Sequence, residues 1–290
     1  MSLEAVLPNL SVRRGECVGK EEIMGLYYNR IVVKVGTSTL TNEIGQNNLK
    51  AFDGIARVLS DIQNLGYEVI LVSSGAIAVG MNKLQTKTRP ASMRIKQAAA
   101  AVGQCSILYL YDKFFSDYDK TVAQILLNAE DMENEEKKEN LINTFNTLLE
   151  MGIIPIVNEN DSVSYTEIQS EDKLFGDNDT LSAVVAVLCR AKRLVILSDI
   201  DGFYDSDPRL HPDAKLIGRV SAIDEKILSL AGGAGSRRGT GGMKTKLQAA
   251  KLAVSQGIDT IITNGKNPAA LYNIIQGDNV GTIFMGKNMA

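Results

Sequence analysis

Residues 31–38 read IVVKVGTS, and this segment decides the fold. Four of its first five residues are the β-branched apolar types that favour strands. A strand that is apolar along its whole length is typical of a parallel sheet covered by helices on both faces. The run ends in Gly36, Thr37 and Ser38, whose small side chains suit a polar turn. The segment therefore predicts a buried strand that ends in a turn able to face a ligand.

Six further short apolar runs follow, separated by longer stretches with helical periodicity. We expect strands at residues 31–35, 69–72, 122–127, 153–157, 194–197, 260–263 and 282–285. We expect helices at residues 49–65, 92–115, 139–150, 180–191, 243–256 and 268–276, and a further helix opening near residue 75. This alternation predicts an α/β fold with one mainly parallel sheet between two layers of helices.

The chain contains no Pro-, Ser- or Gly-rich linker, so we expect a single domain from residue 30 to residue 290. Residues 1–29 are charged and lack an apolar stretch of signal-peptide length. We expect them to be a leader or an extension outside the fold, with Met24 as a possible natural start. The charge run at residues 130–139 is expected to be a solvated loop that leads into a helix.

The composition excludes several classes of function. A formal net charge of -3 and an isoelectric point near 5.4 argue against a nucleic-acid partner. Cys17, Cys105 and Cys189 are widely spaced, which fits a reducing cytoplasm and argues against a zinc site. His211 is the only histidine, so His-based catalytic triads are excluded. No apolar run has the length of a membrane span.

A glycine-rich loop, GTGGMKTK at residues 239–246, leads directly into a predicted helix. Glycine lacks a Cβ atom, so the backbone amides of this loop can approach a phosphate closely. The helix N-terminus favours an anion at the same place, and Lys244 and Lys246 add full positive charges. The loop matches neither the Walker A motif nor the dinucleotide fingerprint. Taken alone, it could equally be a flexible surface turn.

Polar residues follow several of the predicted strands, and ligands of parallel sheets bind beyond the carboxyl ends of the strands. Lys34 lies inside an apolar run, where it is either an edge-strand lysine that faces solvent or the charge partner of a phosphate. The sequences NEND at residues 158–161 and GDND at residues 176–179 form two clusters of carboxylates and amides. Helix capping accounts for one residue of the second cluster. Together the clusters suit an ammonium group.

Six motifs in order resemble the amino acid kinase family: IVVKVGTS, VSSGAIAVG, NENDSV, GDNDTLSA, SDIDGFYDSDPR and GTGGMKTKLQAA. The resemblance runs from about Arg30 to Met285, and within the family it is greatest to the enzymes that phosphorylate glutamate. It implies an αβα sandwich around a mainly parallel sheet. It also implies Mg²⁺-dependent transfer of the γ-phosphoryl group of ATP to the side-chain carboxylate of L-glutamate, the first step of proline biosynthesis.

The resemblance also assigns site residues position by position. It implies that Ser74, Asp161, Asn178 and Asp177 bind the substrate glutamate. It implies that Lys34 and Lys246 flank the transferred phosphoryl group, with Asp179 holding both lysines in place. The implied ATP contacts are Lys34, Gly36, Ser198, Asp199, Thr240, Gly241, Gly242, Met243, Lys244, Thr245 and Lys246.

The chemistry implied in this way needs no general base, because the carboxyl group of the substrate, with a pKa of about 4.3, is already ionised at neutral pH. We expect Mg²⁺ to be held mainly by the phosphates, with no dedicated metal site in the protein. L-proline is the expected feedback inhibitor, and a homo-oligomer is expected. The RNA-binding-like C-terminal domain of many family members is expected to be absent after residue 290. Residues 231–238, AGGAGSRR, are richer in glycine and more basic than the family leads us to expect for a lid over the nucleotide.

Several alternatives remain at this stage. Kinases of acetylglutamate, aspartate, carbamate, uridylate and isopentenyl phosphate share the fold. An acylated glutamate lacks the ammonium group that the two acidic clusters suit, and a uridylate site calls for more basic residues. A protein that only senses glutamate or proline would not need both Lys34 and Lys246.

Overall fold

The structure is a computed structural model that describes residues 22–23, 26–42, 45–86, 92–163, 177–231 and 242–286. These residues form a nine-stranded sheet with the order β4-β5-β3-β2-β6-β8-β9-β7, and β1 pairs with β2 beside this path. The strands are β1 (Glu22–Ile23), β2 (Leu26–Val35), β3 (Glu68–Ser73), β4 (Val122–Leu127), β5 (Ile154–Glu159), β6 (Ala191–Ser198), β7 (Arg219–Val220), β8 (Asp259–Asn264) and β9 (Thr282–Phe284).

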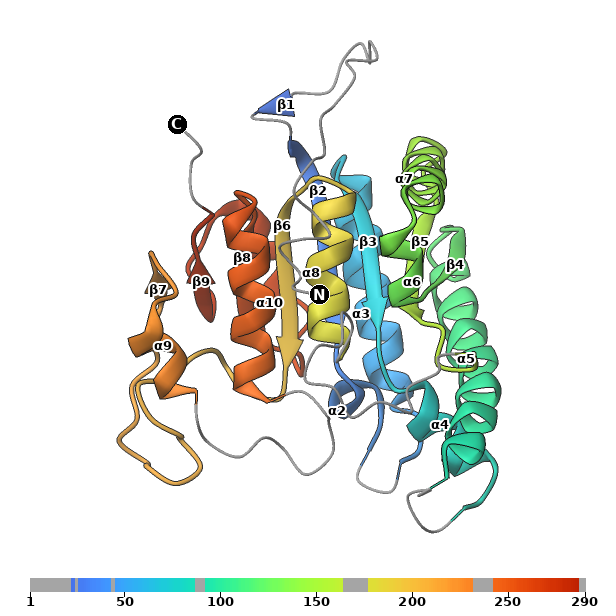
Figure 1. The fold of residues 1–290 in the computed structure, drawn as a ribbon, viewed down its shortest axis with the longest axis horizontal. Helices are drawn as coiled ribbons and strands as arrows, with labels where there is room; N and C mark the ends of the chain where they lie inside the picture. Colours follow the sequence, from blue (N-terminus) through green and yellow to red (C-terminus); the bar gives the residue numbers. More distant parts are fainter. Residues whose placement is uncertain are drawn as a thin grey trace.

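Most neighbouring strands of the sheet are parallel; β1 with β2 and β8 with β9 are the antiparallel pairs. The arrowheads of β3 and β6 point to the same lower edge in Figure 1. Because β2 lies between β3 and β6, its carboxyl end is at the centre of this edge. The expected sheet is therefore present, and the polar turns that follow β2, β3, β5 and β6 lie at its carboxyl edge.

The described helices are α2 (Thr37–Leu40), α3 (Leu49–Asn64), α4 (Ala76–Lys83), α5 (Met93–Ser116), α6 (Ala129–Glu133), α7 (Glu135–Glu150), α8 (Asn178–Leu188), α9 (Glu225–Leu230), α10 (Met243–Ser255) and α11 (Ala270–Gln276). Helices α8 and α10 cover the near face of the sheet in Figure 1. They share a hydrophobic core with α7, whereas α3, α5 and α11 pack in the core of the opposite face. This is the αβα sandwich that the sequence predicts.

Successive side chains of β2 pack in different hydrophobic cores. Val32 packs in the core of α8 and α10, whereas Val33 and Val35 pack in the core of α3 and α5. Successive side chains of a strand point to opposite faces. Lys34 therefore points toward the layer that contains α8 and α10, on the same side as Val32.

Helices α4 and α5 touch along their backbones, because glycine lies at their crossing. A Cβ atom on Gly103 would lie 1.7 Å from the carbonyl oxygen of Ala76, and one on Gly80 would lie 1.8 Å from that of Ala99. Gly75 precedes α4 with a positive φ of 96°, a conformation that glycine adopts without strain. The contact with α5 thus fixes the turn that follows β3.

Two sequence-based expectations are corrected. Strand β2 begins at Leu26, and Glu22–Ile23 pair with it, so residues 22–23 and 26–29 are part of the fold. The charge run at 130–139 is exposed at most positions and contains a helix start, as expected, but its first part is not a loop, because it contains the end of α6. Asn134 caps α7, and acidic residues in the first turn of each helix offset the partial positive charge there. Lys138 in this run is 4% exposed.

Strands β1 and β7 and the short helices α2, α6 and α9 were not expected from the sequence. Each of them has six residues or fewer, which is too short for a hydrophobic period to be recognised. No helix in the described part of the chain is both long enough and apolar enough to cross a membrane.

Candidate active site

A buried carboxylate lies between two buried ammonium groups at the carboxyl edge of the sheet. The Oδ1 atom of Asp179 is 2.6 Å from the Nζ of Lys34, and its Oδ2 atom is 3.1 Å from the Nζ of Lys246. Asp179, Lys34 and Lys246 are 1%, 6% and 7% exposed, in that order. The structure therefore brings together the three residues to which the family resemblance gives a role in phosphoryl transfer.

Each of the three residues is placed by a different element. Lys34 is the penultimate residue of β2, which has strand neighbours on both sides, so it is not a solvent-facing edge lysine. Asp179 lies in the first turn of α8, where the Asp177 side chain caps the helix by accepting from the Thr180 backbone N–H at 2.9 Å. Lys246 lies in the first turn of α10. Two helix starts and one strand end thus meet at the cluster.

The electrostatics keep Asp179 ionised. Burial alone would raise its pKa, but the adjacent ammonium groups of Lys34 and Lys246 outweigh burial and lower the pKa from 3.8 to about 2. The Thr245 hydroxyl also donates to Asp179 Oδ2 at 3.2 Å. The carboxylate therefore holds both lysines in place at every pH near neutrality.

The side-chain amide of Asn178 joins the ends of β3 and β5. Its Nδ2 atom lies 2.7 Å from the carbonyl oxygen of Ser73, 3.0 Å from the Oγ of Ser74 and 2.8 Å from the Oδ1 of Asn158. The Oδ1 of Asn158 also accepts from the backbone N–H of Glu159 at 2.9 Å. Two predicted substrate residues, Ser74 and Asn178, are thus in contact. The sequence offered Asn158 only as one member of an acidic cluster, without this role.

Asp161 lies in a turn that follows β5. The backbone N–H of Asn160 donates to the carbonyl oxygen of Leu127 at 2.9 Å, and Ser162 Oγ donates to Asn160 Oδ1 at 2.6 Å. Asp161 is partly buried, and its loss of hydration raises its pKa from 3.8 to about 6. Since no ammonium group of the described residues offsets this desolvation, the site is suited to a cationic ligand.

Two of the implied nucleotide residues, Ser198 and Asp199, lie on the side of Lys34 that is opposite to β3 and β5. Ser198 ends β6, the next strand, and its hydroxyl donates to the exposed Asp199 at 3.2 Å. Gly242 precedes α10 without a side-chain cap, which leaves the first amides of α10 for an anion. Lys244 is exposed, in contrast to Lys246. A Cβ atom on Gly36 would lie 3.6 Å from the Lys34 Nζ, so the turn after β2 lies against the lysine cluster.

Of the other implied nucleotide residues, Met243 and Thr245 are partly buried in the first turn of α10. Thr240, Gly241 and residues 232–238 of the expected lid lie outside the described residues. At the carboxyl edge of the sheet, Asp161 follows β5, Ser74 follows β3, Gly36 follows β2 and Asp199 follows β6, so the residues with implied substrate roles and those with implied nucleotide roles lie on opposite sides of β2.

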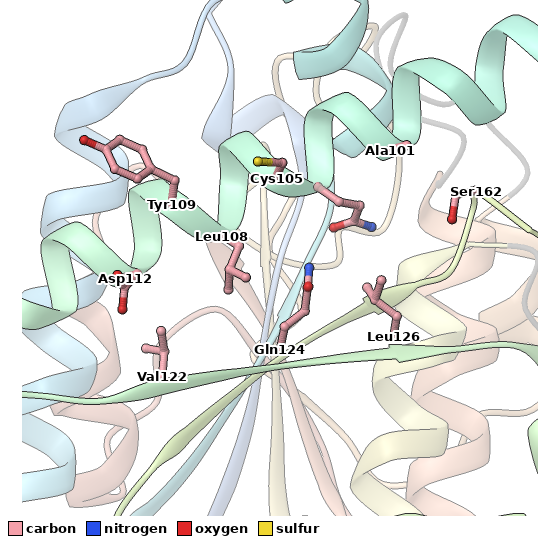
Figure 2. Close-up of a pocket in the computed structure, with 10 residues that line it drawn as sticks. Ala101, Cys105, Leu108, Tyr109, Asp112, Val122, Gln124, Leu126 and Ser162 are labelled. Carbon is pink, nitrogen blue, oxygen red and sulfur yellow. The ribbon is translucent and has the colours of Figure 1, made fainter.

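A separate pocket of about 590 Å³ lies between α5 and β4 (Figure 2). Leu108 and Asp112 of α5 point toward Val122 and Gln124 of β4 across it, and Cys105 and Tyr109 also belong to its lining. Ser162, next to Asp161, contributes to one end of the lining. The pocket contains none of the three charged residues of the buried cluster, so it is separate from that cluster.

The sequence model of the amino acid kinase family matches residues 29–264. The chain belongs to this family. It is 58% identical over 258 residues to the glutamate 5-kinase of Clostridium perfringens (strain 13 / Type A), with 89% of this chain and 96% of that protein covered. It is 50% identical to the glutamate 5-kinase of Listeria innocua serovar 6a over 89% of this chain and 93% of that protein.

Solved structures agree on the amino acid kinase fold. The UMP kinase of Bacillus anthracis superposes with a TM-score of 0.61 and 18% identity, covering 90% of this chain and 97% of that one. The isopentenyl phosphate kinase of T. acidophilum gives a TM-score of 0.60 and 17% identity, covering 88% and 99%. At such identities the likeness concerns the fold, whereas the glutamate 5-kinases are similar in sequence as well. The family recognised from six motifs is therefore confirmed.

Proposed function

We propose that this chain is a glutamate 5-kinase. It transfers the γ-phosphoryl group of ATP to the side-chain carboxylate of L-glutamate and forms L-glutamyl 5-phosphate and ADP, the first step of proline biosynthesis. The observation that carries this proposal is the buried pair of lysines held by one carboxylate at the carboxyl edge of the sheet. The 58% identity to a glutamate 5-kinase supports the choice of substrate.

The two lysines address the main obstacle of the reaction, which is the approach of an anionic carboxylate to a polyanion. Lys34 and Lys246 bind opposite oxygens of Asp179, so both ammonium groups are preorganised before the substrates arrive. Preorganised positive charge stabilises the negative charge on the transferred phosphoryl oxygens in the transition state. Asp179 is the positioning residue of this pair. No proton has to be removed from the acceptor, because a carboxylate is ionised at neutral pH.

The glutamate site is assigned to Ser74, Asp161, Asn178 and Asp177. Asp161 supplies a partly desolvated carboxylate for the ammonium group of the substrate. Asn178 and Ser74 lie in contact at the end of β3, where their polar atoms can orient the substrate. Asp177 caps the helix that carries Asn178, and so sets the direction of that side chain.

The nucleotide site is assigned to the residues that follow β2 and β6 and to the start of α10. Among the described residues, no group of three His, Cys, Asp or Glu side chains could hold a metal ion. We propose that Mg²⁺ is bound mainly through the phosphates of ATP, because this ion gives up its hydration water reluctantly and binds proteins through few ligands. When bound, Mg²⁺ neutralises charge on the phosphates, while Lys34, Lys246 and the amides at the start of α10 do so from the protein.

The test is to trap the acyl phosphate with hydroxylamine. The protein with ATP, Mg²⁺ and L-glutamate should release ADP and form γ-glutamyl hydroxamate, and omission of any component should abolish the product. N-acetylglutamate, aspartate and UMP serve as competing acceptors in the same assay. Hydroxamate from N-acetylglutamate but not from glutamate would assign the chain to a different member of the family.

We also propose feedback inhibition by L-proline at a site that overlaps the glutamate site. Proline has the α-carboxylate and the α-ammonium-type group of glutamate, but it lacks the carboxylate that accepts phosphate. It should raise the apparent glutamate KM, and excess glutamate should relieve the inhibition. Asn178→Ala should weaken the binding of both ligands together. Inhibition that persists at saturating glutamate would instead place proline at a separate site.

A further inference from the structure

Helix α5 contacts both strand ends that carry the proposed glutamate site. The hydroxyl of Tyr111 lies 3.1 Å from the Oγ of Ser73 at the end of β3. The Nε2 of Gln104 donates to the carbonyl oxygen of Glu159 at the end of β5, at 3.1 Å. Tyr111 and Gln104 are seven residues apart, which places them on the same side of the helix. One face of α5 thus supports two neighbouring turns.

Tyr111 is rigidly held. It is fully buried, and its ring packs against Phe52 and Phe115 with centroid distances of 4.8 and 6.2 Å. Burial raises the pKa of the Tyr111 phenol, so its hydroxyl remains neutral and keeps its proton for a hydrogen bond. Such a hydroxyl can hold Ser73 in one orientation.

Ser73 leads directly to the glutamate residues. Its carbonyl oxygen accepts from Asn178 Nδ2 at 2.7 Å, and the next residue, Ser74, accepts from the same nitrogen at 3.0 Å. A shift of the Ser73–Ser74 peptide would therefore move both side chains that we assign to the substrate. Tyr111 itself belongs to the helix behind this turn.

Gln104 has the same relation to the turn that contains Asp161. Its side chain is 8% exposed, and the carbonyl oxygen of Glu159 to which it donates immediately precedes Asn160. The same turn is also held by the Asn158 side chain, which accepts from the Glu159 backbone N–H, by the Asn160 backbone contact to Leu127 and by the Ser162 hydroxyl. Without Gln104, the carbonyl oxygen of Glu159 would lose this side-chain donor.

We propose that Tyr111 and Gln104 are positioning residues that set the affinity for the amino-acid substrate by fixing the turns after β3 and β5. This inference rests on the proposed function. Neither residue contacts Lys34, Asp179 or Lys246 in the hydrogen bonds and ion pairs of the described residues. Their effect should therefore fall on glutamate and proline binding and should spare ATP binding and phosphoryl transfer.

A purely structural role would have a different signature. Loss of packing in α5 would lower the melting temperature and would change all kinetic constants together. A positioning role raises the KM for glutamate while kcat and the KM for ATP stay nearly constant. The experiment therefore compares the change in the glutamate KM with the changes in the ATP KM and kcat.

The first variant is Tyr111→Phe, which removes one hydroxyl and keeps the packed ring. Loss of a buried neutral hydrogen bond typically changes an equilibrium by about five- to tenfold. We expect the glutamate KM to rise by roughly this factor, with the ATP KM and kcat changing by less than about twofold. Tyr109→Phe is the matched control, because Tyr109 lies on the same helix and is 65% exposed; it should leave all three constants unchanged.

The second variant is Gln104→Met, which keeps the length of the side chain and removes its donor. The carbonyl oxygen of Glu159 then lacks this partner, and we expect a rise of about tenfold in the glutamate KM. Gln248→Met, at an exposed position of α10, is the control. If Gln104→Met does not yield folded protein, Tyr111→Phe decides the matter, since it leaves the packed ring in place.

The outcomes separate this inference from the function on which it rests. A wild-type protein that forms no γ-glutamyl hydroxamate overturns both. A wild-type protein that forms hydroxamate, with variants whose glutamate KM is unchanged, overturns the positioning role alone. Equal changes in the ATP KM, the glutamate KM and kcat would also overturn the positioning role, because they would show that Tyr111 and Gln104 only stabilise the fold. A selective rise in glutamate KM, with normal melting temperature, supports the inference.

Discussion

The carboxylate of Asp179 lies 2.6 Å from the ammonium group of Lys34, although one residue lies in the first turn of a helix and the other is the penultimate residue of a central strand. Both side chains are almost completely buried, so each charged group depends on the opposite charge of the other. Lys246 supplies a second positive charge on the same carboxylate. The cluster therefore carries a net positive charge, which suits a phosphoryl group in transit.

Asp179→Asn should damage both activity and stability. The substitution leaves two buried ammonium groups without their counter-ion, and removal of one partner of a buried ion pair typically costs about 3–5 kcal/mol. We expect a lower melting temperature and a kcat reduced by at least about a hundredfold. Asp213→Asn, at an exposed position, is the control and should change neither quantity. Unchanged kcat would show that Asp179 does not position the lysines.

The stability that Asp179 provides should depend on pH in a defined direction. Its pKa is lowered in the folded protein from 3.8 to about 2, so its stabilising effect is fully present above pH 3.8. The effect is lost as the pH falls toward about 2. In acid titrations followed by circular dichroism, the difference in unfolding free energy between wild type and Asp179→Asn should shrink over this interval.

Lys34→Met and Lys246→Met should each reduce kcat far more than they change the glutamate KM. Their charge is needed chiefly when the phosphoryl group is being transferred. Loss of one preorganised charge donor typically costs about 10²–10³ in rate. Lys251→Met is the control, since Lys251 is an exposed residue of the same helix as Lys246. If Lys34→Met keeps nearly the full kcat of the wild type, Lys34 has no role in phosphoryl transfer.

Asp161 predicts a pH dependence of glutamate binding. Its pKa is about 6, so the carboxylate takes up a proton as the pH falls through this value. A neutral carboxyl group attracts the ammonium group of the substrate much less than a carboxylate. The glutamate KM should therefore rise below about pH 6, approaching roughly a tenfold change per pH unit for one titrating group. Steady-state kinetics between about pH 5 and 8 would measure this.

Asp161→Asn is the variant whose glutamate KM is compared with that of the wild type across the same pH range. The variant should have a high glutamate KM that no longer changes with pH over the same interval. Because the raised pKa means that the ionised form is disfavoured by folding, Asp161 lowers the stability progressively as the pH rises from 3.8 to about 6, and the full cost is present above about pH 6. The variant should consequently melt at the same or a higher temperature than the wild type in mildly alkaline buffer. A profile in Asp161→Asn that equals the wild-type profile would assign the titration to another group.

Gly103→Ala tests the close contact between α4 and α5. The added Cβ atom would lie 1.7 Å from the carbonyl oxygen of Ala76, so the helices must separate. We expect a loss of roughly 1–3 kcal/mol or more, as for other overpacked sites, seen as a lower melting temperature. Gly218→Ala is the matched control, since a Cβ atom on Gly218 would meet no other atom within 4 Å and its φ is not positive. Equal melting temperatures of the two variants would contradict the tight packing.

The local pattern of the sequence determined the elements and their order. The run at 31–35 predicted a buried strand, and β2 extends from it, because β-branched residues interrupted only by Lys34 are typical of a sheet covered on both faces. The residues DND at 177–179 predicted a helix start, and Asp177 caps α8 through its own side chain. Periodicity missed short elements such as α6, and it placed the start of α7 at residue 139, whereas the helix begins at Glu135 after its cap Asn134.

Only the tertiary structure decided which polar residues meet. The sequence left open whether Lys34 faces solvent, and the answer follows from the position of β2 between β3 and β6. Strand order depends on pairing between distant segments, which no local periodicity encodes. For the same reason, the contact of Tyr111 with Ser73 and the three oxygens that lie around Asn178 Nδ2 could not be predicted from residue patterns. Local side-chain chemistry fixes the elements, whereas long-range packing fixes the distances between charges.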